Sequence, residues 1–306
     1  MNRQARGAAL LMAMAIMAFA TVAAAAMLAA LGTWTRQSGL AADRVQAEQL
    51  VVAGGDWAGA VLRDDRHASG DVDHPGEPWA LRLPPMPFEN GELAGRIDDQ
   101  QGLFNLNNLV RGGKLDLAQC ARFQRLLSIL HLPAELADAL ADWLDADGVP
   151  QPAGGAEDAY YGALGHPYLA GNRPLVDLDE LAWVRGFDAS VRSRLAPFVT
   201  ALPATTALNV NTAPAEVLAA VVDGLDLDAA RVLVARRDGT FFRNNADFLA
   251  QLGKGATVPE QDIRVGSDYF LVTLRVTYGK ARARGQLLLA RNDAAHRPGV
   301  VWRKLR

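Results

Sequence analysis

The chain has 306 residues, half of them hydrophobic, and a formal net charge of −3. This length suits one large domain or two ordinary ones, and the weakly acidic balance excludes the global basic field typical of nucleic-acid-binding proteins. Cys120 is the only cysteine. An internal disulfide is therefore excluded, and stability outside the cytoplasm would have to come from packing or from bound metal.

The first predicted element is an apolar run from Gly7 to Trp34 that contains no charged residue and follows Arg3 and Arg6. A helix of about 20 apolar residues spans a bilayer. A cleaved signal peptide also has a basic start, and the alanines at 24–26 resemble its cleavage site. Its apolar core, however, is usually only about 7 to 15 residues long. The run therefore favours a membrane anchor, and the shortness of the amino-terminal tail favours a start in the cytoplasm.

The helix is predicted to continue beyond the membrane with an apolar face. Apolar or small residues recur there at three- and four-residue steps, with charged and amide residues between them. These positions are Leu40, Ala47, Leu50, Val51, Gly54, Trp57, Ala58 and Val61. We expect one helix of about 50 residues that anchors in lipid and then packs on a soluble domain. A membrane anchor followed by a coiled linker is the alternative.

Two short strands are predicted after a polar loop rich in turn-forming residues. They are WALRLP (Trp79–Pro84) and ELAGRI (Glu92–Ile97). The segment DDQQGLFNLNNLV follows, with a turn at Gly102 and asparagines alternating with apolar residues.

A hairpin is predicted near the carboxyl end. DYFLVTLRVTYG and ARGQLLLAR form its strands, with Tyr278, Gly279 and Lys280 between them. VVWRKL (Val300–Leu305) is expected to add a further strand. Since strands flank a helical middle from about Leu115 to Gln261, the pattern predicts an α+β fold with a helical insertion.

Two segments inside this helical middle are alike. Each has a helix, then a glycine followed by a bulky apolar residue and an aspartate, then a second helix. The segments are Asp179–Leu195 and Glu216–Val234, in which Gly186-Phe187-Asp188 corresponds to Gly224-Leu225-Asp226. Each aspartate is placed to cap the helix that follows. We interpret both segments as helix-hairpin-helix units.

The second unit raises the possibility of DNA binding. LNVNTAPAEVL (Leu208–Leu218) resembles the helix-hairpin-helix modules of DNA-binding proteins, which hold a phosphate on backbone N–H groups. A membrane-tethered DNA-binding protein is therefore the alternative function. From Thr200 to Val265, however, eight acidic residues stand against six basic ones, and the hairpin VDGLDLD carries three carboxylates. Because carboxylates repel phosphate, we expect a structural module and no nucleic-acid partner.

The stronger chemical signal is acidic. The segment Glu135–Glu180 holds ten carboxylates and a single basic residue, Arg173. Such clustering costs repulsion unless a cation neutralises it. Three of the acids recur at helical spacing before a long loop rich in glycine and proline, which needs something to hold it. They are Asp138, Asp142 and Asp145.

The ligand types in this segment favour calcium. Oxygen ligands, with no nearby cysteine and only His166 as a nitrogen donor, suit Ca²⁺ better than zinc or copper. The segment DADG is not an EF-hand loop, because it has too few alternating oxygen ligands and no closing glutamate. A solvated acidic surface without an ion is the alternative, and charge alone does not decide between the two.

An enzymatic function is not expected. Asp142 and Glu157 could form the acid and base of a glycosidase. A catalytic carboxyl usually lies in an apolar pocket, whereas these acids crowd together. The sequence contains no nucleophile elbow, Cys/His pairing, phosphate loop or HExxH motif.

Together these features resemble the minor pseudopilin K family of bacterial type II secretion systems, also called general secretion pathway protein K. The resemblance extends over nearly the whole chain. RGAALLMAMA is similar to the prepilin leader of that family, and IDDQQGLFNLNNL to its turn after the early strands. DWLDADG with GAEDAYY is similar to its calcium-binding region, and LNVNTAPAEVL to its later helical part.

The resemblance implies a type IV pilin-like α+β fold, in which a long N-terminal helix packs on an antiparallel sheet, with a large α-helical insertion domain. The implied division of the chain has five parts. They are a leader peptide (1–7), a transmembrane part (8–34), a first pilin-like part (35–114), an insertion with helix-hairpin-helix-like units (115–265), and C-terminal strands (266–306).

The resemblance also implies processing, location and partners. The prepilin peptidase would cleave after Gly7, and the new amino terminus at Ala8 would be methylated. The chain would cross the bacterial inner membrane once, with its C-terminal domain in the periplasm. Minor pseudopilins I and J would join it at the pseudopilus tip, and other pseudopilins and the inner-membrane assembly platform are further implied partners.

The resemblance finally implies a metal site and a special position in the filament. Its calcium ligands, for one or two structural Ca²⁺ ions, would be Asp142, Asp145, Asp147, Glu157 and Asp158, with Asn172 or backbone carbonyls available to complete the shell. Ordinary pilins carry glutamate at the fifth mature position, where it neutralises the amino terminus of the preceding subunit. Met12 occupies that position here, which suits a subunit that has no predecessor.

Overall fold

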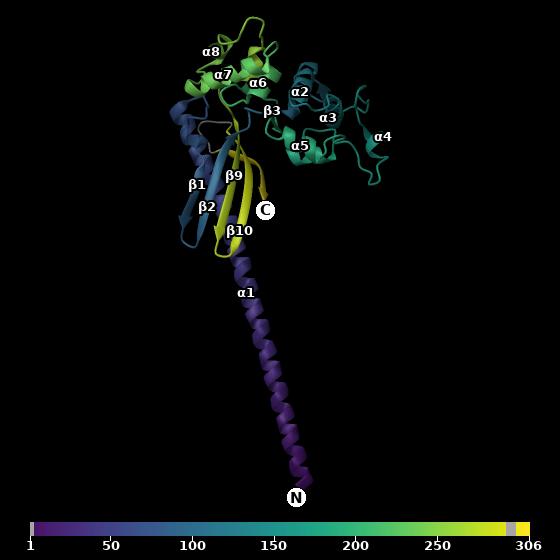
Figure 1. Cartoon of the computed structure of the whole chain (residues 1–306), viewed down its shortest axis with the longest axis vertical. Coiled ribbons are helices and arrows are strands. Elements are labelled where there is room, and N and C mark those ends of the chain that lie inside the picture. The colour runs from purple at the N-terminus through teal and green to yellow at the C-terminus, as the bar shows by residue number, and fades with distance from the viewer. Residues whose placement is uncertain (1–2, 292–297) are drawn as a thin grey trace.

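The computed structural model describes residues 3–291 and 298–306. Its first element is the helix α1 (Arg3–Ser69), whose amino-terminal part extends away from the rest of the chain as a single rod (Figure 1). From Gly7 onward α1 is long and apolar enough to cross a membrane. Gly7 and Ala8 lie within this helix, while Met1 and Asn2 of the implied leader are outside the described residues.

The predicted length of α1 is wrong, because the helix is longer than expected. It has 67 residues and continues into the polar segment after Arg63. Arg66 and His67 in its last turn suit the negative end of the helix dipole. The Gly70 N–H donates to Arg66 O at 3.2 Å just beyond the end.

A five-stranded antiparallel sheet, in the order β1-β2-β9-β10-β11, packs against α1. Its strands are β1 (Leu83–Phe88), β2 (Gly91–Asp99), β9 (Tyr269–Tyr278), β10 (Ala281–Ala290) and β11 (Gly299–Leu305). The predicted carboxyl-terminal hairpin is confirmed, since Tyr278 pairs with Ala281 across the turn. The predicted last strand is confirmed as β11.

The first predicted strand is partly wrong. Residues Pro78–Ala80 form a short 3₁₀ helix, η1, and β1 begins only at Leu83. Trp79 is buried and packs edge-on against Phe270 at a centroid distance of 5.2 Å. Because prolines cannot donate to a ladder, the prolines of LPPMPF confine this strand to the sheet edge, where its register with β2 shifts.

The face of α1 that meets the sheet is narrower than predicted. Ala47, Val51 and Ala58 are fully or almost fully buried against β9 and β10. Leu40 and Trp57 are instead 46% and 51% exposed. Leu40 lies before the tip of the β9–β10 hairpin, which meets α1 where Lys280 N donates to Asp43 Oδ2 at 3.0 Å.

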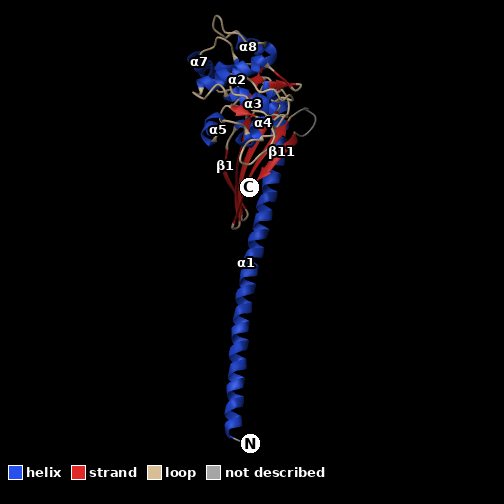
Figure 2. Ribbon diagram, turned by 90° about the vertical axis from the view of Figure 1, so that its right-hand side faces the viewer, coloured by secondary structure: helices blue, strands red, loops and turns tan. Residues whose placement is uncertain are grey.

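The helical segment lies at the end of the sheet that is farther from the amino terminus, and part of it projects to one side of the sheet (Figure 1). Figure 2 shows the same arrangement from the side. One hydrophobic core joins its main helices. The helices are α2 (Leu117–Ile129), α3 (Leu136–Leu144), α4 (Asp158–Tyr161), α5 (Ala189–Leu195), α6 (Ala215–Val221), α7 (Leu227–Gly239) and α8 (Asn245–Leu249).

Two asparagine-rich segments open similar units in this part of the chain. Strand β3 (Phe104–Asn105) pairs in parallel with β6 (Val199–Thr200), and β7 (Leu208–Asn209) pairs in parallel with β8 (Ile263–Arg264). Asn105 accepts from the N–H two residues later at 3.1 Å, and Asn209 does the same at 3.0 Å. The helical segment thus consists of two parts, 104–200 and 208–264, and each part begins and ends at a short pair of parallel strands.

A buried asparagine stabilises the first of these two parts through hydrogen bonds to the backbone. Asn107 Nδ2 donates to Leu175 O at 2.9 Å and to Leu202 O at 2.8 Å, and its Oδ1 accepts from Leu175 N at 2.8 Å. Asn107→Ala leaves these buried backbone groups without hydrogen-bond partners. It is expected to lower the free energy of unfolding by about 3 kcal/mol. Chemical denaturation measures this, with the exposed Gln124→Ala on α2 as control. Equal stability of the two variants would contradict the assignment.

The two helix-hairpin-helix units share their turns but not their first helices. Gly186 and Gly224 both have positive φ, 83° and 74°, which only glycine adopts readily. Asp188 and Asp226 cap α5 and α7 as predicted. The predicted first helix of the first unit is a 3₁₀ helix, η3 (Leu178–Trp183), which ends at the extended backbone of the buried Val184.

Candidate functional site

Three of the predicted ligands meet beside the end of α3. One carboxylate oxygen from each of Asp145, Asp147 and Glu157 lies within 4.8 Å of the other two. Asp145 is the residue that ends α3, and Glu157 directly precedes α4. The intervening loop therefore turns back and brings the two ends together. Asp145 is 2% exposed and Glu157 is 5% exposed.

The two buried acids carry oxygens that lack partners. Within the described residues, Asp145 Oδ1 and both carboxylate oxygens of Glu157 are buried without a hydrogen-bond donor. Glu157 stands at the cap position of α4, yet its side chain makes no capping bond. An unpaired buried carboxylate costs several kcal/mol, so this geometry calls for a cation or a proton.

The pKa values of these acids reflect the same environment. Burial first, and then the neighbouring Asp142 and Asp145, raise the pKa of Glu157 to about 7. Burial and Asp147 raise the pKa of Asp145 to about 6. The acids are therefore poised to exchange protons for a cation near neutral pH.

The other two predicted ligands hold the loop. Asp142 is fully buried, and its two oxygens accept from Gln151 N at 3.2 and 3.1 Å. Asp158 Oδ1 accepts from Ala170 N at 2.9 Å. Asp138 Oδ2 likewise accepts from residue 153 N at 3.1 Å. Three of the five predicted carboxylates thus lie close together. The other two accept hydrogen bonds from backbone N–H groups of the surrounding loop.

Aromatic side chains support the loop from within. Trp143 packs edge-on against Tyr161 and Tyr168, at centroid distances of 5.2 and 6.3 Å. Tyr160 is more exposed, and the Arg185 guanidinium lies 4.7 Å above its ring. Trp143 and Tyr160 therefore act as packing residues around the loop.

The donor set suits a hard cation. The converging atoms are all carboxylate oxygens, which Ca²⁺ prefers. Cys120 lies in the hydrophobic core, where burial and nearby acids, Asp116 first, raise the pKa of its thiol to about 12. Cys120 is thus a packing residue whose thiol stays protonated. The residues at the end of α3 fit a calcium ion.

The second helix-hairpin-helix unit is arranged differently from a phosphate site. Asp223 N donates to Thr257 O at 2.8 Å, and the Asp226 side chain accepts from Ala229 N at 2.8 Å. Asp228 adds a carboxylate in the first turn of α7. Carboxylates therefore lie where a phosphate would have to bind, which favours a structural role for this unit.

Comparison with known proteins decides the family. Two family models, both described as Type II secretion system (T2SS), protein K, match residues 102–204 and 208–265. The chain is also 38% identical, over 293 residues, to type II secretion system protein K of Pseudomonas aeruginosa. That match covers 92% of this chain and 87% of the relative. The chain belongs to the type II secretion system protein K family.

A second relative and a solved structure extend the likeness. The protein K of Klebsiella pneumoniae is 35% identical over 320 residues, which cover 99% of this chain and 97% of the relative. A chain in the crystal structure of the GspK-GspI-GspJ complex from enterotoxigenic Escherichia coli matches with a TM-score of 0.74 at 28% identity. The match covers 85% of this chain and 96% of that chain, so the fold of the matched part is shared with that protein.

Proposed function

We propose that this chain is a non-enzymatic minor pseudopilin, with a type IV pilin-like fold, that starts and caps the tip of a periplasmic pseudopilus together with minor pseudopilins I and J. In that position it supports export of folded proteins across the outer membrane. The observation that carries the proposal is the likeness to the GspK-GspI-GspJ structure, which covers 96% of the matching chain.

The amino-terminal half of α1 supports a place in a membrane and then in a filament core. Its large apolar side chains, including Leu11, Met12 and Ile16, are more than half exposed in the single chain. Lipid or neighbouring helices must cover them. The proposal includes anchoring in the inner membrane, with the folded part in the periplasm. We further propose cleavage after Gly7 by the prepilin peptidase and methylation at Ala8.

The shape of the folded part supports a terminal place. The helical segment sits at the end of the molecule opposite the amino terminus and projects beyond the sheet (Figure 1). In a filament of parallel subunits, such a projection would collide with a subunit stacked above it. The tip is the position where this collision does not arise.

A structural calcium ion completes the proposal. Asp145, Asp147 and Glu157 would hold it, while Asp142 and Asp158 fix the surrounding loop. The ion would neutralise the converging carboxylates and hold the loop before α4 against α3, a structural rather than a catalytic contribution. A second ion would need further oxygen ligands, such as Asn172 or backbone carbonyls.

Calcium stabilisation is expected to depend on pH. The carboxyls of Glu157 and Asp145 have pKa values raised from 4.5 to about 7 and from 3.8 to about 6. Because the folded, ion-free chain binds these protons more tightly than the unfolded chain, its stability should fall as pH rises through this window. Calcium needs the ionised forms, so the rise in Tm that it produces should grow over the same window.

Melting curves with and without calcium, at about pH 5 and about pH 7.5, measure this difference. The double variant Asp145→Asn/Glu157→Gln is the control, and the calcium effect should grow less in it than in the parent chain. An equal calcium effect at both pH values in the parent chain would contradict the site.

Reconstitution with pseudopilins I and J tests the proposed function. The full-length chain in detergent should elute with both partners as one ternary complex in size-exclusion chromatography. A gel-shift assay at low ionic strength should show no binding to DNA. Separate elution of the chain from I and J would count against the proposal, whatever the calcium result.

Met12 gives a separate test of the terminal position. Met12→Glu restores the carboxylate that ordinary pilins carry, so it should leave membrane insertion intact and admit the chain to positions other than the tip. Immunogold labelling of filaments measures the placement, with Met12→Leu as the control. If Met12→Glu stays at the tip alone, the bulk of the helical segment determines the placement.

A further inference from the structure

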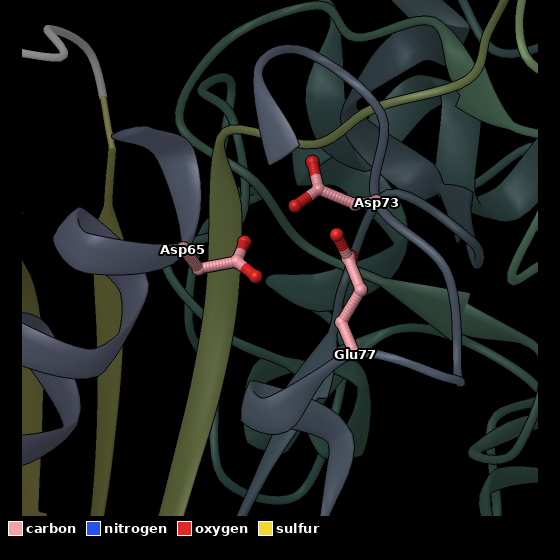
Figure 3. Close-up of side chains that lie close together, drawn as sticks. All are labelled: Asp65, Asp73 and Glu77. Atoms are coloured by element: carbon pink, nitrogen blue, oxygen red, sulfur yellow. The ribbon is translucent and has the colours of Figure 1, made fainter. Parts of the chain in front are cut away.

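A second group of three carboxylates lies outside the proposed calcium site, where α1, the loop after it and the sheet meet. Asp65 lies near the end of α1, Asp73 in the following loop and Glu77 just before η1. One carboxylate oxygen of each lies within 4.8 Å of the other two, and Figure 3 shows the three side chains pointing toward one another. Their exposed fractions are 7%, 0% and 4%. We call these three residues the junction triad.

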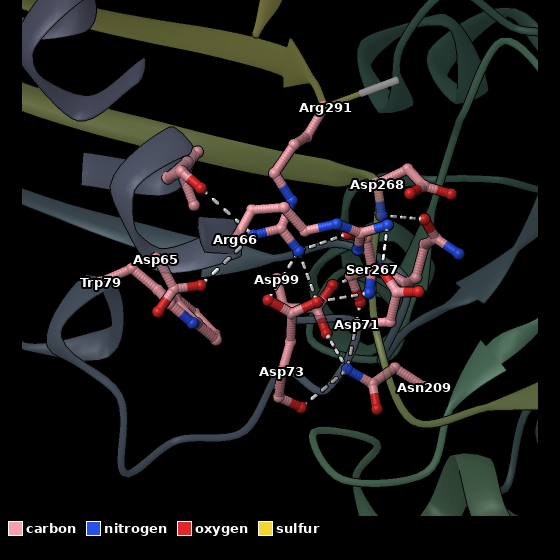
Figure 4. Close-up of polar contacts among 12 residues, drawn as sticks. Asp65, Arg66, Asp71, Asp73, Trp79, Asp99, Asn209, Ser267, Asp268 and Arg291 are labelled. Carbon is pink, nitrogen blue, oxygen red and sulfur yellow. Dashed lines mark hydrogen bonds and ion pairs between the residues drawn. The ribbon is translucent and has the colours of Figure 1, made fainter. Parts of the chain in front are cut away.

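One arginine compensates only part of this negative charge. Arg291, which follows β10, donates through Nη2 to the two oxygens of Asp73 at 2.7 and 2.5 Å and to Ser267 O at 2.8 Å (Figure 4). Its Nη1 is 3.3 Å from Asp65 Oδ2. Asp99 adds a further negative charge near Asp73. With one guanidinium for three carboxylates, two negative charges of the triad remain uncompensated.

Two oxygens of the triad have no partner. Within the part of the chain that the structure describes, Asp65 Oδ1 and Glu77 Oε1 are buried without a hydrogen-bond donor. The other oxygen of each is engaged: Asp65 Oδ2 by Arg291, and Glu77 Oε2 by His74 N at 2.9 Å and Trp79 Nε1 at 2.8 Å. These bonds fix both carboxylates in place and leave one free oxygen on each beside the shared space.

We propose that Asp65, Asp73 and Glu77 bind a calcium ion at this junction. A divalent cation balances the two remaining charges, and carboxylate oxygens are ligands that Ca²⁺ prefers. The ring of His74 stacks on Phe241 at 3.8 Å, away from a ligand role, so nitrogen-preferring metals are disfavoured. The ion would connect α1 to the loop that follows it, which Arg291 in turn joins to the end of β10, and so hold α1 against the folded part of the chain.

A shared proton is the competing explanation for the same geometry. Burial raises the pKa of Asp65 and of Asp73 to about 6, with Glu77 the next cause for Asp65. A triad that is neutralised by protons would bind no metal. Direct measurement of calcium binding therefore separates the two explanations.

The test uses the full-length chain in detergent, with the proposed site at α3 disabled by Asp145→Asn/Glu157→Gln. Calorimetric titration of this background should still show one Ca²⁺ per chain. Adding Glu77→Gln keeps an acceptor for His74 N and Trp79 Nε1 but removes the charge, and should weaken that binding by at least about tenfold.

Terbium provides a second readout. Because Trp79 lies beside Glu77, excitation of tryptophan should sensitise Tb³⁺ at the triad, and Glu77→Gln should remove that luminescence. The control is Asp71→Asn, an exposed acid of the same loop that pairs with Arg66 instead. Asp71→Asn should bind calcium as the background does.

Two results would overturn the proposal: a folded background that binds no calcium, or undiminished binding after Glu77→Gln. If the background fails to fold, the parent chain with and without Glu77→Gln decides, since the variant should lose one Ca²⁺ per chain. Loss of the ternary complex with I and J would not bear on this result, so the two proposals fail separately.

Discussion

Arg291→Met is expected to lower the free energy of unfolding by about 3–5 kcal/mol, because it leaves buried carboxylates without their guanidinium partner. Arg291 is 3% exposed and connects elements far apart in the chain. It donates to Leu62 O near the end of α1, to Asp73 in the loop and to Ser267 before β9. Its guanidinium also lies 4.8 Å above the Phe270 ring.

Denaturant unfolding followed by circular dichroism measures this loss. Arg284→Met is the matched control, since Arg284 lies on β10 and is exposed. The control should change stability by less than about 0.5 kcal/mol. Comparable stability of the two variants would show that the carboxylates around Arg291 are neutralised in another way.

The second large effect is expected at the proposed calcium site. If the ion binds only the folded chain, then calcium at about 100 times its dissociation constant adds about 2.7 kcal/mol of stability. For a folded part of this size, that corresponds to a rise in Tm of roughly 5–10 °C. Asp145→Asn/Glu157→Gln should remove the part of the rise that this site contributes, because it removes both buried carboxylates.

Differential scanning calorimetry with calcium and with excess chelator measures the effect. Glu135→Gln serves as control, because Glu135 is exposed and belongs to the same acidic segment. It should keep the calcium response of the parent chain. An unchanged Tm on calcium addition to the parent chain would show that these acids bind no ion.

Local patterns predict the regular elements well. The 3.6-residue spacing on α1 identifies Ala47, Val51 and Ala58 as core residues, and alternation in DYFLVTLRVTYG identifies β9. Asp188 and Asp226 are recognisable as helix caps because their bonds lie within three residues of each. Interactions this short in sequence are visible without a structure.

Interactions across long sequence distances account for what the sequence did not predict. The sequence does not distinguish the roles of the five acids in this segment. The folded loop places Asp142 against Gln151 N and brings Asp145 close to Glu157. The junction triad and Arg291 are separated by more than 200 residues. The sequence gives one indication of this cluster: Arg291 directly follows the apolar run QLLLA, and several acids lie around the end of α1.

The position of the chain in assembled filaments tests the central proposal most directly. Filaments assembled with the parent chain, carrying an epitope tag at its carboxyl end, can be labelled with immunogold and examined by electron microscopy. If the chain starts and caps the filament as proposed, label is expected at one end of each filament and not along its length. Label distributed along the length would contradict the proposal.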